Sequence, residues 1–195
     1  LSVVSCDNAR ANMEAETSDF GFDFDAARAA AREAWSQALA KITVEGGTRE
    51  EMTNFYTALY HAQVVPNQVS DVNGDYRRHD MQIARLPQGE KRYSTFSLWD
   101  TFRAWHPLMT LIDTPLVNEM IRSLLDMYDA TGELPIWPLS AGETGTMIGY
   151  HAVSVIADAY LKGIRDFDAH KALEAMKVSS DINKKGSDLY LSLGY

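Results

Sequence analysis

The 195-residue chain has little of what several protein classes require. It has one cysteine, Cys6, which excludes an internal disulfide. Its 18 basic residues are outnumbered by 27 acidic ones, and the formal net charge is −9. No nucleic-acid partner is expected, because phosphate binding needs clustered Lys and Arg. No apolar run reaches the roughly 18 residues that a membrane span needs, so no span is predicted.

Several short motifs are also missing. The chain has no Gly-rich phosphate loop, no Gly-x-Ser-x-Gly elbow and no histidine spacing that suits zinc. Asp71, Asn73 and Asp75 alternate as at the start of a calcium loop. The last ligand position, however, holds Gln82 instead of Glu, and Gly74 is misplaced. This pattern predicts a polar turn.

What the chain does have is helical periodicity, and its 46% of hydrophobic residues can fill a sizeable core. Seven segments are predicted to be helical: about 7–16 with Asp7 as cap, from Asp23 or Asp25 to about 39, from the Thr48–Glu51 capping box, from Ser97, from Thr114-Pro115, about Met147 to Lys162, and from Asp168 to about 179. Pro107 should kink or restart the helix from Ser97.

Two of these helices have a pronounced apolar face. One face comprises Phe24, Ala27, Ala30, Ala31, Ala34, Trp35, Ala38 and Leu39, and the other Leu116, Val117, Met120, Ile121, Leu124 and Leu125. The least helical region is 64–86, where Asn73-Gly74 predicts a small hairpin or an ordered irregular loop. Residues 132–138 indicate an extended connection. The expected fold is all-α, with helical hairpins side by side and loops at one end, as in part of an (α/α)6-type toroid.

The stretch from Tyr93 to Arg103 places an aromatic plate, a carboxylate and a guanidinium close together. One interpretation puts Trp99 in the core and makes Asp100 part of a capping box with Ser97, worth about 1 kcal/mol. The other has Trp99 face a cavity as a sugar platform and Asp100 accept hydrogen bonds from hydroxyl groups. Asp100 can do both, because a helix start faces the loop end of a hairpin.

A second candidate region runs from Leu134 to His151. Trp137, Glu143 and several glycines before a helix suit the rim of a pocket. Alternatively, Glu143 stabilises a helix N-terminus and His151 is an ordinary helical residue. Asp100 and Glu143 could be imagined as the two carboxyl groups of a glycosidase. No sequence feature fixes their separation, and we do not favour that pairing.

Several blocks together resemble glycoside hydrolase family 92, the calcium-dependent exo-α-mannosidases. The matching blocks are Val3–Asn12, Phe55–His61, Asp71–Tyr76, Tyr93–Pro107, Met147–His151 and Ala157–Gly163. Each block is modest alone, but their order and spacing are specific. The resemblance covers nearly the whole chain.

The resemblance implies that residues 1–195 are one helical segment, the first part of the catalytic helical domain. It also implies an N-terminal β-sandwich before residue 1 and a C-terminal catalytic remainder. No catalytic residue is assigned here, because the general acid and base are expected downstream. Trp99 and Asp100 match sugar-contacting positions, and Glu143 and His151 match positions in the later block; all four are expected to bind substrate. Calcium is the implied cofactor, with ligands mainly outside this segment.

The implied function is that of one part of an inverting exo-α-mannosidase that removes terminal α-mannose from glycans. This segment would supply part of the −1 subsite and be inactive alone. Its partners would be mannose-containing glycans and the rest of the parent polypeptide, in the periplasm, at the cell surface or outside the cell. Two alternatives stay open: a non-catalytic carbohydrate-binding or scaffold module, and a different α/α-toroid glycosidase, such as one acting on glucosides.

Overall fold

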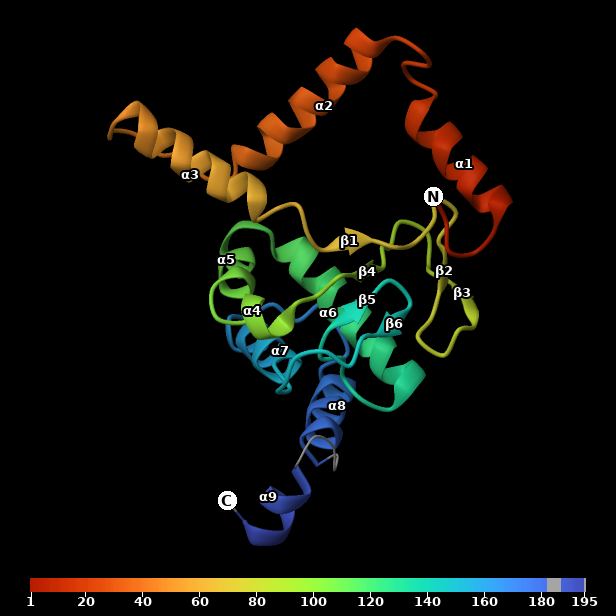
Figure 1. Ribbon diagram of the computed structural model, residues 1–195, viewed down its shortest axis with the longest axis vertical. Helices are drawn as coiled ribbons and strands as arrows, with labels where there is room; N and C mark the ends of the chain where they lie inside the picture. The colour runs from red at the N-terminus through yellow and green to blue at the C-terminus, as the bar shows by residue number, and fades with distance from the viewer. Residues whose placement is uncertain (182–186, 195) are drawn as a thin grey trace.

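The computed structural model describes residues 1–181 and 187–194, and helices dominate it. A compact body lies in the centre, α1, α2 and α3 lie outside it, and α8 and α9 lead away towards the C-terminus (Figure 1). None of the helices in the described residues has the length and apolar composition needed to cross a bilayer.

The first helix, α1 (Cys6–Thr17), begins one residue earlier than predicted and has a different cap. The hydroxyl of Ser5 accepts the Asn8 backbone N–H at 3.0 Å, and Asp7 lies inside the first turn. Ser5 takes the cap because its backbone is extended, as a cap residue requires. Asn12 is the buried residue of α1, and its side-chain amide donates to Asp71 at 2.7 Å.

Helices α2 (Phe24–Leu39) and α3 (Arg49–His61) form a pair outside the body (Figure 1). Asp23 caps α2 and the predicted Thr48–Glu51 capping box is present on α3. The apolar face predicted for α2 is present but not covered, because none of the residues of α2 is buried. Alanine side chains cover too little area to form a core alone, and the large ring of Trp35 is half-buried beside the ring of Tyr60, with 4.5 Å between the centroids.

The core of the body is built on α5 (Trp105–Ile112), α6 (Thr114–Thr131) and α7 (Ala152–Leu161). The predicted stripe on α6 is buried except for Leu116, which is half-buried. Each such burial contributes about 1.5–3 kcal/mol. The cap of α6 is Asp113 and not Thr114, because the Asp113 carboxylate accepts the Leu116 N–H.

Two of the predicted helices are shorter than expected. The helix that follows Ser97 is the short α4 (Leu98–Thr101), and the chain restarts as α5 with Pro107 in its first turn. The helix predicted from Met147 begins only at Ala152, because Gly145, Met147 and Gly149 have left-handed backbone conformations. A Cβ at Gly149 would lie 2.6 Å from the Nε2 atom of His151. Together with its φ of +83°, this close approach makes glycine the favoured residue at position 149.

The short strands form three antiparallel pairs: β1 (Asn67–Gln68) with β4 (Tyr93–Ser94), β2 (Asp75–Arg77) with β3 (Ile83–Arg85), and β5 (Pro138–Leu139) with β6 (Gly142–Glu143). The hairpin predicted within 64–86 is the β2–β3 pair. The Asn73-Gly74 turn lies before β2, and the β5–β6 hairpin adds a strand pair to the predicted extended connection. Helix α8 (Ala169–Asp181) packs against α6 and α7, and its Ala172 and Ala175 belong to the core. It is capped by Asp168 as predicted, and α9 spans Ser187–Leu193.

Candidate functional site

The short helix α4 turns Trp99 and Asp100 outwards. Leu98 is fully buried and anchors the helix in the core, so the next two residues lie on its opposite side. Trp99 is 36% exposed and Asp100 is exposed. The interpretation of Trp99 as a core residue is therefore wrong, and its ring is available at the surface.

Trp99 belongs to a row of neighbouring groups that also contains Arg103, Phe102 and His151. The guanidinium carbon of Arg103 lies 5.2 Å from the ring centroids of both Trp99 and Phe102. Phe102 in turn stacks on His151, with centroids 4.2 Å apart and planes 7° apart. We call these four residues the aromatic row. Burial, and then the positive charge of Arg103, lower the pKa of His151.

Ser97 connects Asp100 to the second candidate region. Its hydroxyl donates a hydrogen bond to Oδ2 of Asp100 and accepts the indole N–H of Trp137 at 2.7 Å. The predicted capping box is wrong, because Ser97 makes no side-chain hydrogen bond to the start of α4. The backbone of Ser97, with φ −82° and ψ 70°, does not have the extended conformation of a side-chain cap. Within the described residues, Oδ1 of Asp100 has no hydrogen-bond donor.

Glu143 holds its own loop together. Its carboxylate accepts the backbone N–H groups of Ile136 at 2.7 Å, Trp137 at 3.1 Å and Gly145 at 3.0 Å. The expectation that Glu143 stabilises the N-terminus of a helix is wrong, because α7 begins well beyond it. Its oxygens are occupied by backbone donors, which also disfavours Glu143 as a catalytic partner of Asp100.

The structure thus brings all four predicted residues into two connected groups. Trp99 and His151 belong to the aromatic row, while Asp100 and Glu143 are joined through Ser97 and Trp137. Sequence reasoning gave Ser97 no role beyond capping, and it placed Phe102 only on the buried face of its helix. Trp99 and Arg103 are four residues apart, and in the longer helix predicted from Ser97 this spacing could have indicated their contact.

The possible metal ligands among the described residues are dispersed. These residues contain no cluster of three or more His, Cys, Asp or Glu side chains arranged to hold a metal. The polar turn at 71–75 does not fit either, because its carboxylates are already bound. Arg85 binds Asp75 at 2.6 and 3.1 Å and, together with Asn8, lowers the pKa of Asp75 to about 2.

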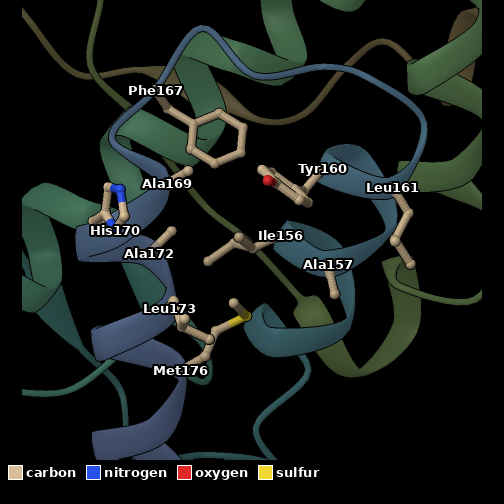
Figure 2. A pocket seen from close by; sticks show the side chains of 10 residues that line it. All are labelled: Ile156, Ala157, Tyr160, Leu161, Phe167, Ala169, His170, Ala172, Leu173 and Met176. Carbon is tan, nitrogen blue, oxygen red and sulfur yellow. The ribbon is translucent and has the colours of Figure 1, made fainter.

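A groove of about 350 Å³ lies between α7 and α8, away from these groups. Figure 2 shows the rings of Tyr160 and Phe167 and the side chains of Ile156 and Met176 turned towards it. Leu161 at its edge is 81% exposed. The lining is mostly hydrocarbon, which suits apolar side chains better than a polyol.

Comparison with known proteins identifies the family. The model of the glycosyl hydrolase family 92 catalytic domain matches residues 8–195, and the chain belongs to this family. The structure superposes on the family GH92 α-mannosidase BT3965 of Bacteroides thetaiotaomicron with a TM-score of 0.89 and 38% identity, over 97% of this chain and 25% of that one. BT3965 has also been solved in complex with mannoimidazole.

Two further relatives agree. The family GH92 inverting mannosidase BT2199 of the same organism superposes with a TM-score of 0.88 and 32% identity, over 100% of this chain and 27% of that one. A secreted glycosidase of Arthroderma benhamiae, itself uncharacterized, is 27% identical over 93% of this chain and 20% of its own length. The chain therefore spans about a quarter of the length of the solved relatives and a fifth of the curated one. The predicted family and the all-α, toroid-type fold are confirmed.

Proposed function

We propose that this chain is the part of an exo-α-mannosidase that positions the terminal mannose of a glycan. The observation that carries the proposal is the outward pair of Trp99 and Asp100 in a chain of this family. The face of an indole covers the C–H side of a sugar, and a carboxylate accepts hydrogen bonds from its hydroxyl groups. One solved relative is named an α-mannosidase and another an inverting mannosidase, which supports mannose as the sugar.

In this proposal Trp99 is the platform, Oδ1 of Asp100 accepts a hydroxyl hydrogen bond, and His151 closes the far end of the aromatic row. Glu143 shapes the neighbouring loop. Rigid positioning of a reactant contributes several kcal/mol to lowering a barrier. The general acid and general base belong to other parts of the polypeptide, and an inverting reaction would place them roughly 6.5–9.5 Å apart. The name of BT2199 supports inversion.

Calcium is proposed as the cofactor because the family resemblance implies it, with ligands outside the described residues. When bound near the sugar, such an ion would polarise hydroxyl groups of mannose. A site outside the cytoplasm is proposed from the secreted relative. The chain alone should bind mannose weakly and release none, since Asp100 and Glu143 do not form an acid–base pair.

The test is mannose release from α-linked mannobioses by the full-length polypeptide, with calcium and then with a chelator. NMR of the first product identifies its anomeric configuration. Calcium-dependent release of β-mannose supports the proposal. A folded protein that binds mannose but releases none from any linkage favours the carbohydrate-binding module instead, and preferential release of glucose favours the glucosidase alternative.

A further inference from the structure

Two segments distant in the sequence are fastened together beside Asp100. The backbone N–H groups of Thr95 and Phe96 donate to the carbonyl of Pro138 at 3.1 and 3.3 Å. Thr95 has a φ of +69°, which a β-branched residue rarely adopts. Such a conformation persists only where the surroundings impose it, and here it turns both N–H groups towards one acceptor.

The next contact between these segments is made by side chains. The indole N–H of Trp137 donates to the hydroxyl of Ser97, and that hydroxyl donates to Asp100. An indole nitrogen can only donate and a carboxylate can only accept, so the direction of this chain is fixed. We call Trp137, Ser97 and Asp100 the indole relay.

The position of Trp137 is itself fixed on both sides of its backbone. Its N–H is bound by the carboxylate of Glu143, and its carbonyl accepts the hydroxyl of Thr144 at 2.9 Å and the N–H of Thr144 at 3.2 Å. The β5–β6 hairpin therefore places the indole, and the indole places the Ser97 hydroxyl.

We propose that Trp137 is a positioning residue for Asp100, acting through Ser97, and that Glu143 serves the sugar site by holding Trp137. This assignment rests on the proposed function for its effect on turnover. The relay occupies Oδ2 of Asp100 and fixes the side-chain rotamer, so Oδ1 faces the incoming sugar hydroxyl in one direction. A helix cap has been given up for this arrangement, and departures from local rules of this kind are expected at functional sites.

Kinetics of the full-length polypeptide test the proposal. Trp137→Phe keeps a ring but removes the donor, and Ser97→Ala removes the link. Each should lower kcat/KM for α-mannobiose about tenfold, and the double variant should lose no more than either single one, because both break one path. Ser97→Thr keeps the hydroxyl and should restore most of the activity. Additive losses, or a Trp137→Phe variant with unchanged kcat and KM, would overturn the proposal.

A second measurement does not depend on turnover. In full-length protein labelled with ¹⁵N-tryptophan, the Nε1–H resonance of Trp137 is the one that Trp137→Phe removes. Ser97→Ala should move it upfield and speed its exchange with water, and Asp100→Asn should shift it as well. The matched control is Trp105, whose indole N–H donates to the carbonyl of Ala62 and should not respond.

The two measurements separate this proposal from the proposed function. If neither Ser97→Ala nor Asp100→Asn shifts the Trp137 resonance, the indole relay is refuted, whatever the rates of mannose release are. If it responds to both but the wild-type protein releases no mannose, the proposed function fails while the coupling of Trp137 to Asp100 stands.

Discussion

The imidazole of His151 lies parallel to the phenyl ring of Phe102, with 4.2 Å between the ring centroids. His151 is the residue immediately before α7, and Phe102 follows α4. The stack therefore joins the segment that presents Trp99 and Asp100 to the start of a core helix. His151 therefore has a defined packing partner in Phe102. The sequence pattern could not indicate this contact, because the two residues are far apart in the chain.

This stack should be replaceable by another aromatic pair. His151→Phe retains a flat ring against Phe102, whereas His151→Ala removes it and should lower the free energy of unfolding by about 1 kcal/mol. Urea unfolding of the full-length protein compares the two variants. Equal destabilisation by Phe and Ala would show that the nitrogens of His151, and not its ring face, matter to the fold.

Asp100→Ala should reduce mannoside hydrolysis by two to three orders of magnitude, on the order of the effect of removing one transition-state contact. The fold should stay nearly intact, because Asp100 is exposed and does not cap α4 through Ser97. Circular dichroism of the full-length protein tests whether the fold is retained, and its kcat/KM tests the loss of activity. Asp166→Ala, which breaks an exposed contact to Arg122, is the control and should leave the rate unchanged.

Asp126→Asn should be strongly destabilising. Arg92 is only 2% exposed, and its guanidinium lies 2.8 Å from the Asp126 carboxylate, which also accepts the hydroxyl of Tyr76 at 2.7 Å. Removing the partner of a buried charge costs about 3–5 kcal/mol. The matched variant Asp166→Asn breaks a pair at the surface and should cost less than about 1 kcal/mol. Similar urea midpoints for the two variants would contradict this prediction.

His106 should make the fold sensitive to acid. It is 3% exposed, its ring nitrogens have no partner among the described residues, and burial lowers its pKa to about 3. Below about pH 6.5 the unfolded chain binds a proton that the folded chain does not, so stability falls by up to about 1.4 kcal/mol per pH unit. Above about pH 6.5, His106 is neutral in both the folded and the unfolded chain, so its titration does not change the stability.

Replacing this histidine isolates its effect. His106→Leu should flatten the dependence of the urea midpoint on pH between about 6.5 and 4, while leaving stability at pH 8 similar or higher. The urea midpoint of the variant is subtracted from that of the wild type at each pH. The effect of the carboxylates, which both proteins share, is removed by this subtraction. Parallel curves for the two proteins would mean that the imidazole of His106 finds a partner or is protonated in the folded state.

The apolar groove between α7 and α8 should make the isolated chain associate. Leu161 is 81% exposed and Leu173 is 49% exposed at its edge (Figure 2). Leu161→Lys with Leu173→Lys should lower the apparent mass in gel filtration with light scattering. Leu111→Lys is the control, because Leu111 is 77% exposed but lies on α5. A wild-type chain that stays monomeric at high concentration would argue against this expectation.

The elements that the sequence predicted best are those whose signals are local. The Thr48–Glu51 box, the Asp168 cap and the stripe on α6 all depend on residues within one or two helical turns. Two errors were also local, because Ser5 and Asp113 cap α1 and α6 in place of the predicted Asp7 and Thr114. The error at Ser97 involved a distant group. Ser97 could not be predicted to abandon its cap for Trp137, because that contact spans 40 positions.

The candidate site shows the same division. The exposed pair of Trp99 and Asp100 follows from helix geometry once Leu98 is assigned to the core. The role of Glu143 depends on how its loop turns, and the left-handed conformations of Ser140, Gly145 and Met147 set that turn. Glycine is the residue type that indicates a left-handed conformation in a sequence, and Ser140 and Met147 give no such signal. A hairpin at this point was therefore not predicted.

Helix α1 is attached to the rest of the molecule by hydrogen bonds, and this affects how it unfolds. Its buried residue is a polar one, Asn12, and Asp71 receives hydrogen bonds from Asn12 at 2.7 Å, Asn8 at 2.8 Å and Ser2 at 2.7 Å. A hydrophobic contact weakens gradually as the two surfaces move apart. A hydrogen bond, in contrast, is lost when its donor–acceptor distance changes by a fraction of an ångström or its angle by a few tens of degrees. The three donors converge on one carboxylate, so a small shift of that turn loosens them together. The first helix should therefore detach in one abrupt step.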